Sequence, residues 1–274
     1  MAPLGLIAGA GALPRRILQA LAYQSRPAFV VALEGQCDAE TVLSVPHAWH
    51  RLGAAGAILA SLRSAGVQDL VMAGKVERPS LLTLAPDAVG VAMLARIGWR
   101  ALGDDGLLRA VTAELEAQGF RVLSPATVLA ESVAPLGRWG QHAPDDWAQR
   151  DRDRGFAVVA ALGVADVGQA VVVQQGLVLA VEAAEGTDAM IARAASLARP
   201  GPRPVLIKAA KPTQDMRLDP PVIGPHTIAT CSAAGFAGVA VEAGRVMVVD
   251  LPQVIGEADR LGLFLEGVAS CVSS

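Results

Sequence analysis

The N-terminal half of the chain alternates short apolar runs with longer helical patterns, and this alternation limits the possible folds more than any other feature. The runs predicted as buried strands are 4–8, 29–33, 69–73 and 121–123, and the helical patterns are 13–23, 54–65, 91–101 and 104–118. Strands that alternate with helices are typical of a mostly parallel sheet covered by helices on its faces. We therefore expect a Rossmann-like α/β domain in this half.

A break in the pattern separates this half from the next. The stretch 133–144 is rich in proline and glycine and shows no clear period, which is typical of a connection between domains. We therefore predict an N-terminal Rossmann-like domain at 1–132, a linker at 133–150, and a C-terminal α/β domain at 151–274.

The C-terminal domain is also expected to combine strands and helices. The expected strands are 170–173, 177–181, 205–207, 239–241 and 246–249, and the expected helices are 145–162, 188–197, 227–234 and 252–261. Two strand pairs, 168–183 and 238–250, look like hairpins that turn at glycine.

Composition excludes several classes of protein. Of the 274 residues, 53% are hydrophobic and 18% are charged, which is enough for a substantial core and excludes disorder. The formal net charge of −3 gives no positive patch of the kind that binds nucleic acid.

The longest stretch without a formal charge, 220–241, contains prolines and glycines that prevent it from spanning a bilayer as one helix. The three cysteines are scattered and have no metal-type spacing, so we expect reduced thiols in a cytoplasmic protein.

The turn after the first strand carries Gly9, Ala10 and Gly11. Glycines at this position let the backbone approach a phosphate at a helix N-terminus. The third glycine of a dinucleotide fingerprint is replaced by Pro14, although Glu34 could imitate its ribose-binding acid. An anion-binding loop and a plain strand-to-helix turn both remain open here.

Two further positions each have a functional and a structural explanation. Lys75 comes directly after the third strand, where open α/β sheets place their ligands, and it is either a phosphate contact or a solvated loop lysine. Asp104 and Asp105 precede a helix, where capping is a better explanation than metal binding.

A strand-to-helix junction in the second half holds Gly186, Thr187 and Asp188. Thr187 is a candidate N-cap, and Gly186 would permit the close approach of a ligand. A capped turn does not account for the acids beside it, Glu185 and Asp188, so we favour a functional role for this junction.

The stretch 208–224 is the most informative part of the sequence. It mixes strong cations and carboxylates beside a buried strand, and these residues are Lys208, Lys211, Gln214, Asp215, Arg217 and Asp219. Phosphate chemistry needs such a mixture, because cations neutralise oxygens and a carboxylate holds a metal or positions water. The four histidines form no comparable group, and structural roles are expected for them.

Taken together, these stretches resemble the LpxI family of UDP-2,3-diacylglucosamine pyrophosphatases. The matching segments, in family order, are LGLIAGAGALP, AGKVERP, GDDGLLRAV, GQAVVVQQGLVLAVEAAEGTDAM, KPTQDMRLDPPVIG and AGFAGVAVEAGRVMVVD. They cover nearly the whole chain, and the final LGLFLEGV fits as well. One departure is Pro220, where a leucine-like residue is expected.

The resemblance implies a reaction and a set of site residues. It implies hydrolysis of UDP-2,3-diacylglucosamine, a lipid A precursor, to UMP and 2,3-diacylglucosamine 1-phosphate with Mg²⁺, and its catalytic aspartate matches Asp219. We expect Asp219, Arg217 and Lys211 to act in catalysis. Asp219 and Asp188 are the expected metal ligands. The expected substrate contacts are Gly9, Ala10, Gly11, Lys75, Gly186, Thr187, Asp188, Lys208 and Gln214.

The expected partners follow from a lipid-linked nucleotide-sugar substrate. Its acyl chains require transient association with the inner-membrane surface, and a homodimer is possible. Two other functions stay open: an NAD(P)-dependent Rossmann-type oxidoreductase that uses Gly9, Gly11 and Glu34, and a non-catalytic nucleotide-sugar binding protein.

Overall fold

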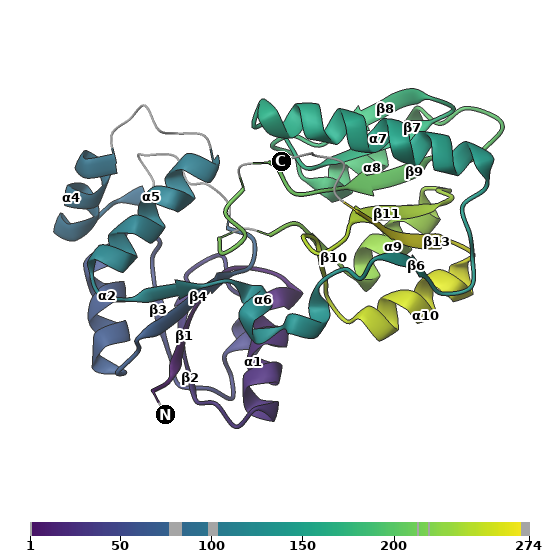
Figure 1. Cartoon of the computed structure of the whole chain (residues 1–274). Helices are drawn as coiled ribbons and strands as arrows, with labels where there is room; N and C mark the ends of the chain where they lie inside the picture. Colours follow the sequence, from purple (N-terminus) through teal and green to yellow (C-terminus); the bar gives the residue numbers. More distant parts are fainter. Residues whose placement is uncertain (1, 77–83, 98–103, 213, 219, 270–274) are drawn as a thin grey trace. The chain divides into compact units, whose positions relative to one another are not determined.

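The computed structural model describes residues 2–76, 84–97, 104–212, 214–218 and 220–269 (Figure 1). The chain forms two compact units. The first consists of Met1–Ala130 together with Asp215–Asp219, and the second of Glu131–Gln214 together with Pro220–Ser274. Both units combine helices with a sheet, so the predicted fold class, a two-domain α/β protein, is confirmed.

The first unit contains a five-stranded sheet in the order β3-β2-β1-β4-β5, and every neighbouring pair is parallel. Its strands are β1 (Leu4–Ala8), β2 (Ala28–Leu33), β3 (His47–His50), β4 (Asp69–Ala73) and β5 (Arg121–Leu123). Its helices are α1 (Ala12–Tyr23), α2 (Ala55–Ser64), α4 (Ala88–Ile97), α5 (Asp104–Ala117) and α6 (Pro125–Val128), with the 3₁₀ turn η1 (Ala39–Thr41). This order is the doubly wound pattern of a Rossmann-like domain, as expected.

The core of the first unit follows from the apolar spacing in its elements. Helix α1 buries Leu13, Ile17 and Leu21, which lie four residues apart on one face. The central strand β1 buries Leu4 and Leu6 completely, because it pairs on both sides and is covered on both faces.

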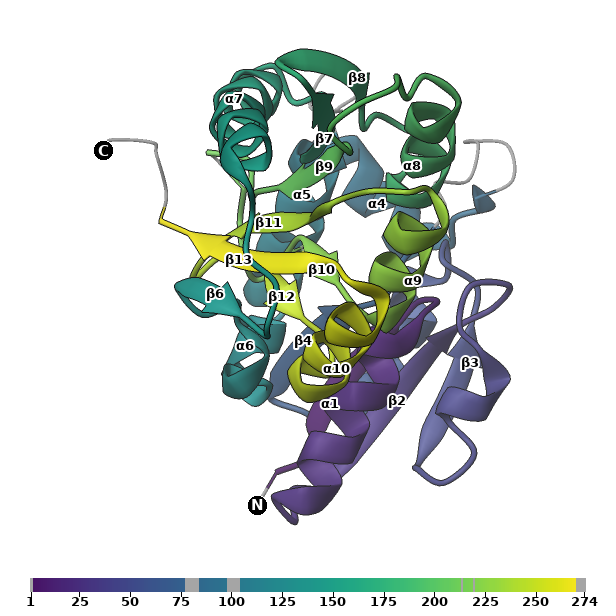
Figure 2. The same cartoon turned by 90° about the vertical axis from the view of Figure 1, so that its right-hand side faces the viewer.

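The second unit contains a six-stranded sheet in the order β6-β13-β11-β9-β7-β8 (Figure 2). Its strands are β6 (Gly137–Trp139), β7 (Ala170–Gln174), β8 (Leu177–Val181), β9 (Val205–Lys208), β11 (Gly238–Glu242) and β13 (Phe264–Val268), and a separate pair is β10 (Val222–Ile223) with β12 (Met247–Val248). Its helices are α7 (Asp146–Val164), α8 (Thr187–Ser196), α9 (Pro225–Ala233) and α10 (Leu251–Leu261). The 3₁₀ turn η2 (Ala130–Ser132) begins at the last residue of the first unit and continues into the second.

Alternating side chains divide the second unit into two layers of core. Val171 and Ile207 pack with α7 on one face of the sheet, whereas Val172 and Leu206 pack with α8, α9 and α10 on the other. Strands β9, β11 and β13 are mutually parallel, so their carboxyl ends share one edge of the sheet. Strand β8 is antiparallel to β7, which is antiparallel to β9, so β8 ends at the same edge.

One of the two expected hairpins is confirmed and the other is wrong. Strands β7 and β8 pair antiparallel through a turn at Gln175 and Gly176, both of which have positive φ. By contrast, β11 has a parallel neighbour on each side, β9 and β13, and therefore offers no free edge for a hairpin partner. After the turn at Gly244, the chain leaves this sheet and pairs β12 with β10 instead.

The structure also assigns two segments differently from the sequence. Residues 133–150, expected as a linker, lie in the second unit and contain β6, which pairs antiparallel with β13. Asp215–Asp219, expected in the C-terminal domain, belong to the first unit. Within the described residues, no helix is long and apolar enough to cross a bilayer.

Candidate active site

At the carboxyl edge of the first sheet, the turns after β1 and β4 are joined through their backbones. Ala10 N–H donates to Lys75 O at 2.8 Å, and Lys75 N–H donates to Ala10 O at 2.9 Å. A Cβ atom on Gly9 would lie 2.5 Å from Lys75 O, and Gly74 has a φ of +97°. The structure therefore brings together Gly9, Ala10 and Lys75, three of the residues singled out from the sequence.

The start of α1 already has an anionic partner. Gly11 is the N-cap of α1, and its N–H donates to Oδ2 of Asp38 at 3.2 Å. A carboxylate here satisfies the same free N–H that a phosphate would bind. Asp38 follows the second strand and carried no signal in the sequence. A phosphate bound at this N–H would have to replace the aspartate.

The carboxyl edge of the second sheet gathers buried charged side chains instead. Lys208, at the end of β9, is 5% exposed, and its Nζ donates to Oγ1 of Thr187 at 2.8 Å. The Thr187 hydroxyl in turn donates to Oε1 of Glu182 at 2.5 Å, and Glu182 is 7% exposed. Lysine, threonine and glutamate thus form one hydrogen-bonded row from the end of β9 to the start of α8.

The junction before α8 places its expected residues around this row. Gly186 is the N-cap with a φ of 81°, and Asp188 lies in the first turn with Oδ2 3.5 Å from Nε2 of His226. The side chains of Asp188 and His226 are both largely exposed. Beneath them, burial and then Asp188 raise the pKa of the Cys231 thiol, which is therefore unsuited to act as a nucleophile.

A second group lies just beyond β9. Lys211 is 9% exposed, and its Nζ lies 2.6 Å from Oδ1 of Asp166. Gln214 accepts the Lys211 N–H at 3.0 Å and donates to the side chain of Gln169 at 3.2 Å. Glu242, at the end of β11, accepts the backbone N–H of Ala210 at 2.9 Å. The structure therefore places Lys208, Lys211 and Gln214 at one edge of the second sheet.

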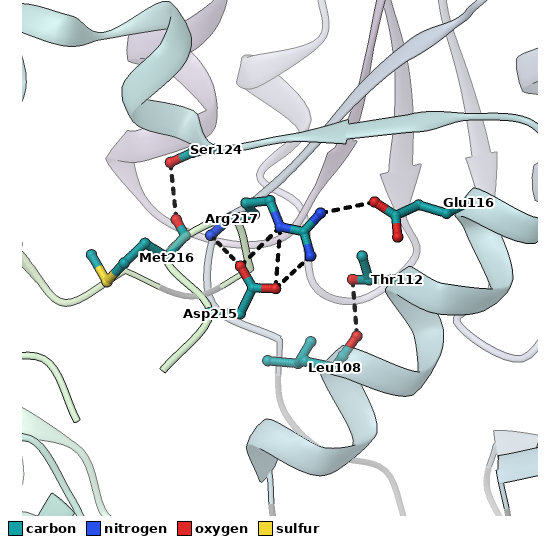
Figure 3. A network of polar contacts seen from close by, with 7 residues as sticks. All are labelled: Leu108, Thr112, Glu116, Ser124, Asp215, Met216 and Arg217. Carbon is teal, nitrogen blue, oxygen red and sulfur yellow. Dashed lines mark hydrogen bonds and ion pairs between the residues drawn. The ribbon is translucent and has the colours of Figure 1, made fainter. Parts of the chain in front are cut away.

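Arg217 is clamped between two carboxylates of the first unit (Figure 3). Its Nη2 and Nε contact Asp215 at 2.7 and 3.0 Å, and its Nη1 contacts Oε1 of Glu116 on α5 at 2.8 Å. The forked bond to Arg217 lowers the pKa of the Asp215 carboxyl, and Asp215 in turn raises the pKa of the arginine.

The backbone of the same segment is held as well. Ser124 Oγ donates to Met216 O at 2.9 Å, as Figure 3 shows, and Leu218 is buried in the core of the first unit. The four residues before Asp219 are therefore fixed to this unit by charge, hydrogen bonding and packing. Asp219 itself lies outside the described residues.

No group of three or more carboxylate, imidazole or thiol side chains in the described part of the chain is placed to hold a metal ion. Within the described residues, the ion-pair partner of Asp188 is His226. The described residues alone therefore do not provide a magnesium site.

Sequence reasoning missed several acids that complete these groups. Asp38, Glu116, Asp166 and Glu242 each partner a backbone N–H or a cation of the segments described above. A usable signal existed only for Glu242, an acid at the end of an apolar strand, because that position of a parallel strand faces the ligand edge.

Comparisons with known proteins cover almost the whole chain. The models of the LpxI N-terminal domain and the LpxI C-terminal domain match residues 3–132 and 135–266. The chain is 42% identical over 278 residues to a Caulobacter vibrioides protein described as UDP-2,3-diacylglucosamine pyrophosphatase LpxI, and the match covers 98% of each. Among solved structures, CobK precorrin-6A reductase matches at 14% identity, over 100% of this chain and 90% of that one, and its TM-score of 0.32 is too low to support an inference. The resemblance and the expectation of an enzyme are thus confirmed, and the chain belongs to the LpxI family of hydrolases.

Proposed function

We propose that this enzyme hydrolyses the pyrophosphate bond of UDP-2,3-diacylglucosamine, releasing UMP and 2,3-diacylglucosamine 1-phosphate in lipid A biosynthesis. The observation that carries the proposal is the 42% identity to the Caulobacter relative over 98% of both chains. An identity of this extent includes both units and every segment that holds a candidate residue.

The buried lysine of the second unit supports this chemistry. Among the described residues, the Lys208 ammonium makes one hydrogen bond, to the Thr187 hydroxyl. We infer that its other two N–H bonds serve an anionic ligand, because a buried cation whose described partner is a neutral hydroxyl is stabilised by an anion. Cleavage of a phosphoanhydride depends on charge stabilisation at the phosphate oxygens, which Lys208 and neighbouring Lys211 would supply.

Asp219 is the proposed catalytic aspartate, because it matches the aspartate of the family motif. The segment before it is fixed by the Arg217 clamp and by buried Leu218. We therefore assign Arg217 a positioning role, since both of its carboxylate partners would have to be exchanged before it could bind the diphosphate. Lys211 is the better candidate for direct contact with phosphate.

Magnesium is proposed as the cofactor on the strength of the family resemblance. Asp219 and Asp188 are the proposed ligands, and the ion would neutralise phosphate charge. The described residues do not by themselves complete a metal site. A cytoplasmic enzyme at the inner-membrane surface fits the lipid substrate, and the homodimer stays a prediction.

The direct test is to incubate the purified chain with UDP-2,3-diacylglucosamine, with Mg²⁺ or with a chelator, and to measure UMP. We expect UMP to be released with Mg²⁺ and not with the chelator. Substrate that binds and stays intact would favour the binding-protein alternative.

The oxidoreductase alternative has its own test. It requires a phosphate at the start of α1, where Asp38 accepts the Gly11 N–H. We expect no binding of NAD⁺ or NADP⁺ in a calorimetric titration, and micromolar binding of either would restore this alternative.

A further inference from the structure

The backbone around Lys211 is held on both sides by one pair of side chains. Glu242, at the end of β11, accepts the N–H of Ala210 through Oε2 at 2.9 Å. Arg245, three residues later, donates from Nη2 to Lys211 O at 3.0 Å. The two side chains also face each other, with Nη1 of Arg245 3.4 Å from Oε1 of Glu242. The pair therefore connects residues 210 and 211 to the turn after β11.

The order of the strands explains why the pair meets this segment. Strand β11 is the direct parallel neighbour of β9, so the residues that follow the two strands lie together at the carboxyl edge of the second sheet (Figure 2). Gly244 has a φ of +76°, and the N–H of Val246 donates to Glu242 O at 3.1 Å, which closes a tight turn. This turn brings the Arg245 side chain beside the acid that precedes it by three residues.

Other parts of the second unit restrain Lys211 as well. Its N–H donates to Oε1 of Gln214 at 3.0 Å, and its Nζ lies 2.6 Å from Oδ1 of Asp166. Helix α7 packs closely against it, because a Cβ atom on Gly163 would lie 3.1 Å from the Lys211 Cα atom. The Asp166 side chain is 39% exposed. The backbone of this lysine is thus fixed, while its ammonium ends beside an acid that solvent reaches.

A buried ion pair is a costly way to satisfy one backbone N–H. Glu242 is 2% exposed, and burial of a carboxylate carries a desolvation cost that a neutral acceptor would avoid. The Arg245 guanidinium offsets that cost and adds a charge-assisted hydrogen bond to Lys211 O. Satisfied polar networks of this kind rigidify the segments that they join. What the charged pair adds over a neutral acceptor is a fixed position for Lys211.

A second buried carboxylate in the same unit shows a purely structural arrangement. Asp151 on α7 is 0% exposed and accepts the N–H groups of Gln175 and Gly176 at 2.8 and 2.6 Å. These residues form the turn from β7 to β8, which lies at the opposite edge of the sheet because β7 is antiparallel to β9. Asp151 thus holds a hairpin turn, whereas Glu242 holds the segment that carries Lys211.

We propose that Glu242 and Arg245 are positioning residues, which fix the backbone of Lys211 so that its ammonium stands where the diphosphate of the substrate binds. The proposal rests on the proposed function, which gives Lys211 that contact. The pair acts through the lysine and does not itself touch the substrate. A cation that is held in place beforehand stabilises developing phosphate charge without reorganisation during the reaction.

A double-mutant cycle with Lys211→Met tests whether Arg245 acts through Lys211. The readout is kcat/KM of the full chain for UMP release from UDP-2,3-diacylglucosamine with Mg²⁺. We expect Arg245→Met to lower kcat/KM by about tenfold in the parent, and by less than about twofold once Lys211 is methionine. Equal losses in the two backgrounds would overturn the proposal, because the arginine would then act independently of the lysine.

Arg245→Lys guards against a variant that fails to fold. It keeps a cation beside buried Glu242 but lacks the planar fork whose second branch reaches Lys211 O. We expect a folded protein, checked by circular dichroism, with kcat/KM lowered by about fivefold. Parental kcat/KM in this variant would contradict the proposal, because the contact with Lys211 O would then be dispensable.

Asp151→Asn is the matched control for loss of stability. It weakens a buried carboxylate that also accepts backbone N–H groups, so it should lower the midpoint of thermal unfolding. Its kcat/KM should stay within about twofold of the parent, since the opposite edge of the sheet is affected. A loss of kcat/KM as large as that of Arg245→Lys would assign both effects to stability and reject the positioning role.

Binding of UDP in the presence of a chelator separates this proposal from the proposed function. In calorimetric titrations, we expect Arg245→Lys to weaken UDP binding by about threefold in the parent and not in Lys211→Met. A parent that binds UDP in this way but releases no UMP keeps the positioning pair and rejects the hydrolysis. UMP release with equal losses in both backgrounds rejects the pair alone, and a parent that neither binds UDP nor releases UMP rejects both.

Discussion

The two sheets end in edges of different construction. At the first edge, the turns after β1 and β4 meet backbone to backbone, and glycine allows the approach at Gly9 and Gly74. At the second edge, buried Lys208, Glu182 and Glu242 gather at the ends of the strands. The first edge is built mainly from backbone contacts and holds few charges, whereas the second holds charged side chains that are buried from solvent. Substitutions at the first edge should therefore mainly lower the free energy of unfolding, whereas substitutions at the second should mainly lower kcat.

In this comparison of the two edges, the largest effect on stability is expected from Gly74→Ala. Gly74 has a φ of +97°, and an added Cβ would lie 2.7 Å from the backbone carbon of Gly9. Left-handed strain and the backbone overlap together should lower the free energy of unfolding by about 3 kcal/mol or more. Thermal unfolding followed by circular dichroism measures the loss.

Gly66→Ala provides the matched comparison for this prediction. Gly66 lies in the same unit and has a φ of +70°, but nothing lies within 4 Å of an added Cβ. It should cost about 1–2 kcal/mol, the cost of the left-handed backbone alone. Equal losses for the two variants would show that close approach at the first edge contributes nothing.

In the same comparison, the largest effect on kcat is expected from Lys208→Met. Removing the buried charge should lower kcat for UMP release by about 100-fold, because a preorganised cation is lost where phosphate charge develops. Lys75→Met removes an exposed lysine at the first edge and should cost no more than about tenfold. Equal losses would contradict the distinction between a charged edge and a backbone edge.

Thr187→Val should have a smaller effect. It keeps the shape of the side chain but breaks the hydrogen bonds to Lys208 and Glu182. We expect kcat to fall about tenfold, on the order of 1.4 kcal/mol in activation free energy, since the hydroxyl that orients the charged Lys208 and Glu182 side chains is lost. Thr187→Ser retains the hydroxyl and should restore most of the rate, whereas a serine variant as slow as valine would point to packing instead.

The smallest effect concerns acid stability and the Arg217 clamp. Because the folded-state pKa of Asp215 is lowered, its stabilisation is present above the ordinary carboxyl pKa of about 3.9 and is lost as pH falls through the lower folded value. Arg217 is 43% exposed, so the contribution should be about 1 kcal/mol or less. Asp215→Asn should remove this part of the pH dependence from unfolding curves measured between pH 6 and pH 3, a range of roughly three units around that pKa.

Most of the fold could be predicted from periodicity. The predicted strands 4–8 and 69–73 coincide with β1 and β4, because fully buried parallel strands appear as continuous apolar runs. Strand β3, with the sequence HAWH, was missed because it lies at the edge of its sheet and lacks such a run. The short strand β6 was concealed by a composition that is typical of linkers.

The candidate site could be predicted only as residue types. Charged residues between 208 and 219 indicated phosphate chemistry, but their pairing depends on contacts far apart in the sequence. Arg217 pairs with Glu116 on α5, and Lys211 pairs with Asp166, two residues after α7 ends; neither acid is marked by a local sequence pattern. The division of this segment between the two units also follows from tertiary packing, through Leu218 in the first unit and Lys208 in the second.

The most direct test of the proposed chemistry compares Asp219→Ala with the parent chain on UDP-2,3-diacylglucosamine and Mg²⁺, with UMP as the readout. Asp146→Ala, which removes an exposed acid in the first turn of α7, is the control. We expect the parent and the control to release UMP at equal rates, and Asp219→Ala to be folded but slower by a factor of at least about 1,000. An Asp219→Ala variant with near-parental UMP release, or a folded parent that releases none, would contradict the account.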